Sequence, residues 1–499
     1  MTAVAAATVR QYGHHIGGEQ VDGTLIDRHD PARGQLVARF AEGSSRDVDR
    51  AVKAARQVFT SRQWSRLTAT DRAGLLEAFA ALVTEHRDRL AGIDSVEVGK
   101  PLRFAQGDID LGIAHIRQAA ALARTARGEA FTDVAPGYTA IATRRPVGVA
   151  GLIIPWNFPG LITLQKLPYA LAAGCPVVIK PSEFTSGSAL ELAALAETAG
   201  FPPGAVNVVT GYGPVTGAAL VQHPDVGYVS FTGSTATGRA VLRDSATTIT
   251  RVGLELGGKA ANVVFADADL DAVADGVVFG AFANQGESCV AGSRLIVQEA
   301  IAAELSAEVV RRAARLRVGM PDDPASDLGA LIHHRHRDSV AAAVTAGTDL
   351  GAEVLLGGQA PAETDLADGA FFLPTVLGSV AAESPVFQEE IFGPVLSITT
   401  FQDEDDAVRL ANATRYGLAQ SLWTKDVDRA LSVGNRLDAG TVWVNTTSDG
   451  APELAFGGVK GSGFGRDAGA EGLREFTEYR TLQLRGERRP SPFASGERQ

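Results

Sequence analysis

Cys289 lies in a stretch of small and polar residues, Phe282-Ala-Asn-Gln-Gly-Glu-Ser-Cys-Val-Ala-Gly-Ser-Arg294, that follows a predicted helix. The other cysteine of the chain, Cys175, lies in an apolar run. A nucleophilic thiol needs access and help in ionising, whereas a packing cysteine needs neither. A lone cysteine is more often buried filler than a nucleophile. The motifs found elsewhere in the chain lead us to predict that Cys289 is a nucleophile and that Cys175 packs in a core.

Glu255 places a carboxylate inside an apolar strand, in the run Leu254-Glu-Leu-Gly-Gly-Lys259. Burial there would raise its pKa and make it a usable general base near neutral pH. The alternative is a glutamate on an edge strand that faces water. The flanking leucines and the double glycine, which permits close approach of backbone, favour the functional interpretation.

Three further motifs follow predicted strands. Pro155-Trp-Asn157-Phe-Pro could offer the asparagine amide to a developing oxyanion, and Lys180-Pro-Ser-Glu183 could bond the hydroxyls of a nucleotide ribose. The segment Phe231-Thr-Gly-Ser234 opens a helix whose N-terminus could meet phosphate oxygens, although it matches neither a Gly-x-Gly-x-x-Gly nor a Walker A motif. Each motif alone is also compatible with an ordinary turn or a solvated loop.

The elements that would position these motifs form an α/β pattern. Strands and turns are predicted over 1–46, helices over 45–126 and a polar hairpin over 127–146. From Pro146 to Leu256, continuous apolar strands alternate with helices, which predicts a parallel sheet covered on both faces. The alternation restarts after a double glycine, which is the best domain boundary. A mixed strand pattern from about Glu471, with strand residues over 473–484, precedes a polar tail.

Composition excludes several classes of protein. The chain has 499 residues and a net charge of −12, and no Lys/Arg cluster offsets that charge, so a nucleic-acid partner is not expected. Two cysteines form no disulfide framework, the start lacks the features of a signal peptide, and no apolar run is long enough for a membrane span. We expect a cytoplasmic protein with no membrane partner. No cluster has metal-ligand spacing, and His333, His334 and His336 are interpreted as a solvated turn or helix face.

A thiol, an amide donor, a buried carboxylate and a nucleotide-type sheet together suit covalent oxidation of a carbonyl through a thioester. With Glu389-Glu390-Ile-Phe392-Gly-Pro394, the motifs closely resemble the NAD(P)-dependent aldehyde dehydrogenase superfamily, in the order found there, over almost the whole chain. The resemblance implies an α/β protein with a Rossmann-like cofactor domain, an α/β catalytic domain and a small β oligomerisation arm.

The resemblance also implies domain limits and assembly. The NAD-binding domain would comprise 1–126 and 147–257, the catalytic domain 258–470, and the oligomerisation segment 127–146 with 471–490, followed by a tail over 491–499. Self-association as a dimer or tetramer is implied, with NAD as cofactor, NADP as the alternative, and a small-molecule aldehyde as substrate.

The roles implied for individual residues complete the mechanism. Cys289 would attack the aldehyde, Asn157 would hold the oxyanion, and Glu255 would activate the water that hydrolyses the thioester; Lys166 and Asp467 match positions with secondary roles in orientation and proton relay. The cofactor-binding residues implied are Ile153, Pro155, Trp156, Lys180, Ser182, Glu183, Gly213, Phe231, Gly233, Ser234, Leu256, Glu390 and Phe392. The substrate residues implied are Phe158, Gln165 and Phe456.

Departures from the family pattern concern the substrate pocket. Gln165 stands where many members have tryptophan, and Gly450 where an aromatic residue is common, so we predict a wider and more polar pocket for a polar or bulky aldehyde. Acidic residues could lie near its mouth and favour amino-aldehydes, although we prefer to interpret them as solvated loop acids: Asp108, Asp110, Asp449 and Glu453. The alternatives are a CoA-acylating enzyme, which generally lacks the Glu255 base, and a catalytically silent crystallin-like scaffold.

Overall fold

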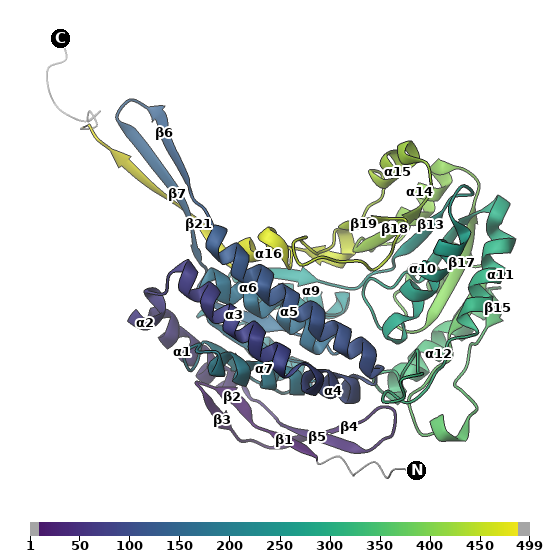
Figure 1. Cartoon of the computed structure of the whole chain (residues 1–499), viewed down its shortest axis with the longest axis horizontal. Coiled ribbons are helices and arrows are strands. Elements are labelled where there is room, and N and C mark those ends of the chain that lie inside the picture. The colour runs from purple at the N-terminus through teal and green to yellow at the C-terminus, as the bar shows by residue number, and fades with distance from the viewer. Residues whose placement is uncertain (1–8, 488–499) are drawn as a thin grey trace.

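The computed structural model describes residues 9–487, and two large sheets organise it (Figure 1). The first sheet has eight strands in the order β20-β12-β11-β8-β9-β10-β2-β3. Their bounds are β2 His14–Ile16, β3 Glu19–Val21, β8 Val149–Ile153, β9 Val177–Lys180, β10 Val206–Val208, β11 Val226–Thr232, β12 Arg251–Glu255 and β20 Gly463–Phe464. The five strands from β12 to β10 are parallel, which confirms the predicted parallel sheet.

Helices cover both faces of this sheet because its apolar strands alternate between two cores. Leu152 and Ile179 pack in one core with α3, α5, α6 and α7, whereas Ile153 and Val178 pack in the other with α1. The helices are α1 Ser45–Thr60, α2 Arg62–Ser65, α3 Ala69–Glu85, α4 Arg87–Val98, α5 Leu102–Thr125, α6 Pro159–Ala173, α7 Gly187–Thr198, α8 Ala218–Val221 and α9 Thr235–Ser245. Helix α5 begins at Leu102, directly after Pro101, which is its N-cap.

The second sheet has seven strands in the order β15-β16-β17-β14-β13-β18-β19. Their bounds are β13 Ala261–Val264, β14 Arg294–Gln298, β15 Glu353–Leu356, β16 Thr375–Gly378, β17 Val395–Phe401, β18 Ala419–Trp423 and β19 Thr441–Val444. The helices that accompany it are α10 Leu270–Phe282, α11 Ala302–Ala313, α12 His334–Asp349, α13 Pro385–Gln388, α14 Glu404–Asn412 and α15 Val427–Gly434. Among these elements, β16, α12 and α13 were not predicted.

A long β-arm projects from the body of the molecule (Figure 1). Its strands are β6 Glu129–Ala135, β7 Tyr138–Pro146 and β21 Thr477–Arg485, and β7 pairs antiparallel with both of the others. The strand pattern predicted from Leu473 begins only at Thr477, because α16 Gly469–Glu475 occupies the preceding residues. A small N-terminal sheet combines β1 Arg10–Tyr12, β4 Leu25–His29 and β5 Leu36–Ala41. Residues 488–490 of the expected arm and the tail 491–499 lie outside the described residues.

The chain returns from the second sheet to the first. Strand β20 pairs antiparallel with β12, so that Gly463 lies opposite Glu255. Gly463 has φ 109°, and a β-carbon there would collide with the backbone oxygen of Leu254. Only glycine permits this approach without strain, and the approach carries Asp467, four residues later, to the end of β12.

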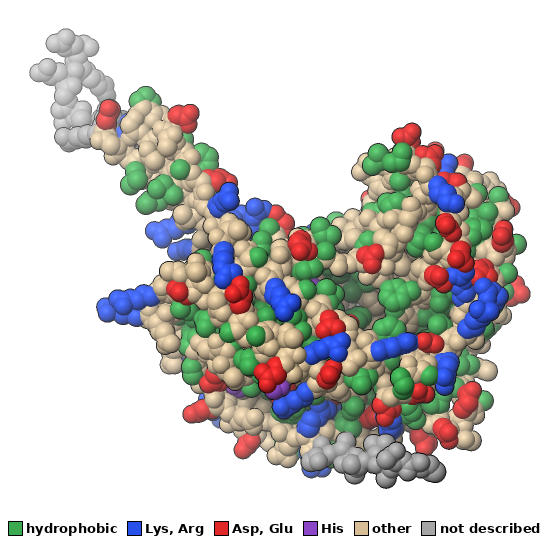
Figure 2. All heavy atoms as spheres, viewed as in Figure 1, with side chains coloured by type: hydrophobic (Ala, Val, Ile, Leu, Met, Phe, Trp, Pro, Cys, Tyr) green, Lys and Arg blue, Asp and Glu red, His purple; other side chains and the backbone are tan. Residues whose placement is uncertain are grey.

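The surface of the described residues shows no strong segregation of charge. On the face drawn in Figure 2, basic and acidic side chains are interspersed over the body of the molecule. Between residues 9 and 487, no helix combines the length and apolarity needed to cross a bilayer.

Gly463→Ala should therefore destabilise the protein more than Gly351→Ala. Both glycines have positive φ, but a β-carbon at Gly351 would meet nothing within 4 Å, so that variant isolates the conformational strain. The clash at Gly463 should add about 1–3 kcal/mol to the loss of unfolding free energy. Chemical denaturation of the two variants measures this difference, and equal losses would show that β20 moves away from β12 without cost.

Candidate active site

A cavity of about 430 Å³ lies between α5 and α6 on one side and the loops of the second sheet on the other. It brings together residues that are far apart in the sequence: Phe158, Gln165, Glu255, Cys289, Phe456 and Asp467. All three predicted substrate residues therefore line the cavity that contains the predicted nucleophile. Most of the remaining lining is apolar, with aromatic rings from Phe104, Phe279 and Trp443.

Cys289 is presented by an unusual turn. After α10 the backbone passes through three successive left-handed residues, Asn284 (φ 52°), Gln285 (φ 57°) and Gly286 (φ 71°). Left-handed conformations cost free energy for residues with a β-carbon, so the surrounding contacts must hold this turn. The Asn284 amide does so by donating to the carbonyl of Glu287, at 3.0 Å. The Cys289 thiol is half-buried at the cavity, whereas Cys175 is fully buried and its sulfur donates to the carbonyl of Phe476.

Asn157 is buried and held beside the nucleophile loop. Its side-chain amide donates to the carbonyl of Glu287 at 2.9 Å, and its own carbonyl accepts from the Asn284 amide at 3.3 Å. Glu287 lies two residues before Cys289. The second amide hydrogen of Asn157 has no partner in residues 9–487. Asn157 itself is not part of the cavity lining, but its neighbour Phe158 and its partner Asn284 are.

Glu255 ends β12 and is only 5% exposed, as the apolar flanks predicted. Its Oε2 has no hydrogen-bond partner in the described part of the chain. Burial raises its pKa well above the ordinary value, and the charge of Asp467 adds to that rise. A β-carbon at Gly457 would lie 2.6 Å from Glu255 Oε1, so the loop can pack against this carboxyl only as glycine.

Behind Glu255, a buried ion pair joins α6 to the segment that follows β20. Lys166 Nζ lies 2.5 Å from Asp467 Oδ2 and donates to Ser230 Oγ at 2.6 Å. Ser230 in turn donates to Asp467 Oδ1 at 3.3 Å. The three groups form a closed, desolvated network, in which loss of one charge would leave the other buried and unpaired.

The thiol of Cys289 is protonated at neutral pH in this state. Burial raises its pKa to about 12, and the carboxylates of Glu390 and Glu255 contribute to the rise. A thiolate is the reactive form, so the site needs a base or a bound positive charge to generate it.

The expected nucleotide-binding residues lie at one edge of the first sheet. The register places Lys180 beside Ile153, and Ile153 beside Phe231, at the carboxyl ends of neighbouring parallel strands. Lys180 Nζ lies 3.4 Å from Glu183 Oε2, and Ser234 caps α9 by accepting from Thr237 N. Around this edge, Ser182 and Leu256 are buried, Pro155, Trp156 and Gly233 are half-buried, and Gly213 opens a short turn.

Glu390 and Phe392 lie on the other side of this edge. Glu390 Oε1 accepts from Gly258 N at 2.9 Å, and burial raises the pKa of Glu390 to about 7. The Phe392 ring packs edge-on against Trp156, with centroids 5.2 Å apart. The two glutamates that raise the pKa of the Cys289 thiol, Glu390 and Glu255, thus come from different parts of the fold, since Glu255 ends β12 and Glu390 precedes β17.

The interpretation of the histidine run as fully solvated is wrong. His333 caps α12 by accepting from the backbone of His336, and His336 is half-buried, edge-on to Trp156 and 2.7 Å from the carbonyl of Phe392. Only His334 is exposed. The aromatic neighbours that bury His336 come from distant segments, so no local pattern indicates them.

The acidic residues proposed near the pocket mouth differ in their surroundings. Asp108 lines the cavity, but it is paired with the buried Lys100 at 2.7 Å, and Asp110 is paired with Arg87 outside the cavity. Asp449 also lines the cavity and accepts from Thr446, and Glu453 is exposed. In residues 9–487, no group of three His, Cys, Asp or Glu side chains could hold a metal ion.

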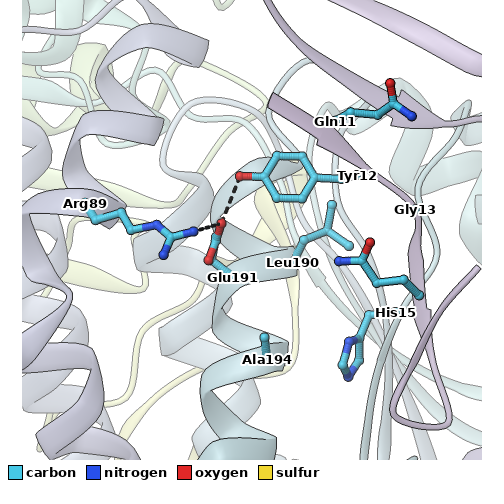
Figure 3. Close-up of a pocket in the computed structure, with 9 residues that line it drawn as sticks. Gln11, Tyr12, Gly13, His15, Arg89, Leu190, Glu191 and Ala194 are labelled. Atoms are coloured by element: carbon cyan, nitrogen blue, oxygen red, sulfur yellow. Dashed lines mark hydrogen bonds and ion pairs between the residues drawn. The ribbon is translucent and has the colours of Figure 1, made fainter. Parts of the chain in front are cut away.

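A second cavity, of about 260 Å³, lies between the N-terminal strands and α7 (Figure 3). Its charged groups are already paired, because Glu191 accepts from Tyr12 at 2.9 Å and from Arg89 at 2.6 Å. These bonds fasten the N-terminal strands to α4 and α7. Since the cavity holds no nucleophile, we regard it as structural.

Comparison with known proteins agrees with this site. The model of the aldehyde dehydrogenase family matches residues 18–482. The chain belongs to the aldehyde dehydrogenase family. It is similar to an NADP/NAD-dependent aldehyde dehydrogenase, PuuC, of Escherichia coli, at 42% identity over 91% of each chain.

Solved structures of aldehyde dehydrogenases share the fold. An NAD-dependent enzyme from Sinorhizobium meliloti aligns with a TM-score of 0.94 at 41% identity, over 97% of this chain and 96% of that one. A betaine aldehyde dehydrogenase from Staphylococcus aureus, solved in complex with NAD+, aligns with a TM-score of 0.95 at 34% identity, over 97% of each chain. The activity of this family member is NAD(P)-dependent aldehyde oxidation.

Several residues around the active site were not predicted from the sequence. Ser230 completes the network of Lys166, and Asn284 and Glu287 brace the nucleophile loop. His115 and Thr232 line the aldehyde dehydrogenase cavity. Of these residues, only Asn284 could have been found from the sequence, because asparagine tolerates left-handed backbone and lies close to Cys289 in the chain.

Alkylation of Cys289 by iodoacetamide should rise about tenfold per pH unit above neutral pH in the cofactor-free enzyme, because its pKa lies far above 7. Glu390→Gln should accelerate alkylation at pH 8, where the Glu390 carboxyl is ionised, but not at pH 6, where it is mostly protonated. Glu389→Gln is the control, since Arg415 already pairs Glu389. Mass spectrometry follows the adduct, and equal rates for all three proteins at pH 8 would contradict this electrostatic assignment.

Proposed function

We propose that this aldehyde dehydrogenase is a hydrolytic enzyme that prefers NAD+ and oxidises bulky aldehydes to carboxylic acids. The observation that carries the proposal is that the Cys289 thiol and the buried Glu255 carboxyl line one cavity. A nucleophile and a base with a raised pKa, enclosed together, suit acyl transfer to water. Glu255 also favours water over CoA as the acyl acceptor, and the complete set of reactive groups favours an enzyme over a silent scaffold.

The side chains divide the reaction between them. Cys289 loses its proton and its sulfur adds to the aldehyde carbon, while the free amide hydrogen of Asn157 holds the oxyanion, a contribution of about 2.7–4 kcal/mol for such a donor. Oxidation of this adduct leaves a thioester on Cys289. Glu255 then takes a proton from water, whose oxygen displaces the sulfur and releases the acid. Lys166 and Asp467 behind Glu255 set its charge and orientation.

The carboxyl ends of β8, β9 and β11 carry side chains that suit a dinucleotide. Lys180 and Glu183 would hold the adenine ribose, Ser234 and Trp156 would lie on the pyrophosphate side, and Glu390 would bond the nicotinamide ribose. The half-buried, partly neutral carboxyl of Glu390 and the cation of Lys180 match the hydroxyl groups of such a ligand. NAD+, when bound, accepts the hydride from the aldehyde carbon. The carboxylate of Glu183 disfavours a 2′-phosphate and hence NADP+.

The substrate class follows from the cavity walls. Aromatic and aliphatic side chains dominate them, which favours an aldehyde with a sizeable apolar body. Gln165 supplies a smaller and more polar wall than an indole ring would. Among the acids that line the cavity, Asp108 is paired with Lys100 and Asp467 with Lys166, and the raised pKa of Glu255 favours its neutral form. Asp449 is the one acid of this lining left without either, so a cationic substrate is not favoured.

We extend the proposal to domains and assembly. Residues 1–126 and 147–257 would bind the cofactor, 258–470 would carry the nucleophile, and the arm would mediate assembly as a dimer or tetramer. Large apolar side chains are exposed on both faces of the arm's sheet, including Phe131, Val134, Ile141 and Leu482, and green surface marks this arm in Figure 2. The low cysteine content fits the cytoplasm.

Cys289→Ser should abolish NADH production, because an uncharged hydroxyl is a far weaker nucleophile, and it should leave NAD+ affinity unchanged. Cys175→Ser, at the buried cysteine, is the control and should retain most of the activity. Absorbance assays with a panel of aldehydes and NAD+ titrations measure both quantities. Residual turnover near the wild-type rate would remove Cys289 as the nucleophile.

Glu255→Gln should leave a rapid burst of about one NADH per active site and slow the steady state at least about a hundredfold, because deacylation loses its base. Stopped-flow mixing with a bulky aldehyde separates the two phases. A normal steady-state rate after the burst would place the base elsewhere in the site.

Glu183→Gln should raise kcat/KM for NADP+ about tenfold relative to NAD+, because it removes a negative charge beside the ribose. Glu299→Gln, at an exposed carboxylate without an ion-pair partner among the described residues, serves as the control. An unchanged ratio of the two cofactors would show that Glu183 does not face the ribose.

A further inference from the structure

His115 forms part of the cavity wall with a defined orientation of its ring. It lies on α5, is 4% exposed, and its Nδ1 lies 3.2 Å from the hydroxyl oxygen of Tyr169. That hydroxyl donates its only hydrogen to the carbonyl of Pro452, at 3.0 Å. The Tyr169 oxygen must therefore accept from Nδ1–H of His115, which leaves Nε2 as an unprotonated acceptor. Burial lowers the pKa of His115 to about 4, consistent with a neutral ring.

Gln165 lies one helical turn before Tyr169 on α6 and lines the same cavity. Its side chain is half-buried, and its amide has no hydrogen-bond partner within the described part of the chain. Helices α5 and α6 are in close contact near these residues, since a β-carbon at Gly112 would lie 2.5 Å from Leu164. The wall of the cavity formed by α5 and α6 thus carries the acceptor nitrogen of His115 and the free amide of Gln165.

These polar groups lie in largely apolar surroundings. Leu111, Leu161 and Ile162 line the cavity beside them, so an unmet hydrogen bond there costs free energy that a suitable ligand recovers. The neutral imidazole offers no charge to an ammonium group, and the nearby carboxylate of Asp108 is already paired with Lys100. A neutral group that both donates and accepts, such as a hydroxyl, matches this pair of side chains.

We propose that His115 and Gln165 form a specificity subsite for a hydroxyl group on the body of the aldehyde, with His115 accepting the hydroxyl hydrogen. This inference rests on the proposed oxidation of bulky aldehydes. It names the substrate class as hydroxylated, uncharged aldehydes, in which the hydroxyl lies away from the reacting carbon. The subsite acts through binding and orientation, and Cys289 and Glu255 carry out the same chemistry.

The test uses matched substrates: 3- and 4-hydroxybenzaldehyde against 3- and 4-methylbenzaldehyde, which have similar size but no donor. In the wild-type enzyme, kcat/KM should be about tenfold higher for at least one hydroxylated isomer than for its methyl partner, the effect of one buried hydrogen bond. His115→Phe should abolish this preference, because kcat/KM falls more for the hydroxylated substrate than for its methyl partner. His115→Gln, which restores an acceptor oxygen, should recover part of the preference. His334→Gln, at an exposed histidine, is the control.

Failure of the hydroxyl subsite and failure of the proposed function give different results. Equal rates for hydroxylated and methylated partners in the wild-type enzyme, or a preference that survives in both His115 variants, would overturn the subsite. Absence of oxidation for all four aldehydes would instead overturn the proposed substrate class of bulky aldehydes. Thermal unfolding of each variant identifies misfolded protein, and the conservative glutamine variant then decides the result.

Discussion

The buried charges behind Glu255 are the constraint on which the active site depends. Lys166 contributes one positive charge, and Asp467 and Glu255 contribute two acids, in a region where all three side chains are almost fully enclosed. A dry interior tolerates one ion pair more readily than an additional free carboxylate, so Glu255 stays protonated more readily than a glutamate in water. The ion pair thus contributes to the stability of the fold and also influences the pKa of Glu255. Any packing defect that admits water to this network would therefore change both the stability of the fold and the pKa of Glu255.

The active site also requires that its motifs meet, and parallel strands ensure this because their carboxyl ends lie along one side of the sheet. The carboxyl ends of β9, β8 and β11 lie side by side, so three short motifs from distant parts of the chain converge there without a dedicated loop scaffold. The second sheet contributes the thiol and Glu390 from the opposite side. The reactive groups therefore come from two separately packed bodies, and their relative position depends on backbone contacts such as that between Gly258 and Cys289.

The sequence supported the parallel sheet and the main catalytic groups because their signals are local. An acid inside an apolar strand, or a cysteine among glycines and serines, is visible within a few residues. The bracing of Asn157 by Asn284, the tautomer of His115 and the burial of His336 depend on partners more than 50 positions away, and no periodicity encodes them. Strand β16 follows Pro374, a residue that marks turns, and the helix α16 was hidden by the apolar pattern that leads into β21.

The return of the chain through β20 has a consequence for biosynthesis. The first sheet contains strands from His14 to Phe464, and Asp467 follows its last edge strand. A nascent chain can form the parallel core of this sheet early, but Lys166 has no counter-ion until Asp467 has left the ribosome. Chains that terminate prematurely would then lack the final edge and bury an unmatched cation. The synthesis of β20 and Asp467 thus separates compaction of the first sheet from the appearance of a competent enzyme.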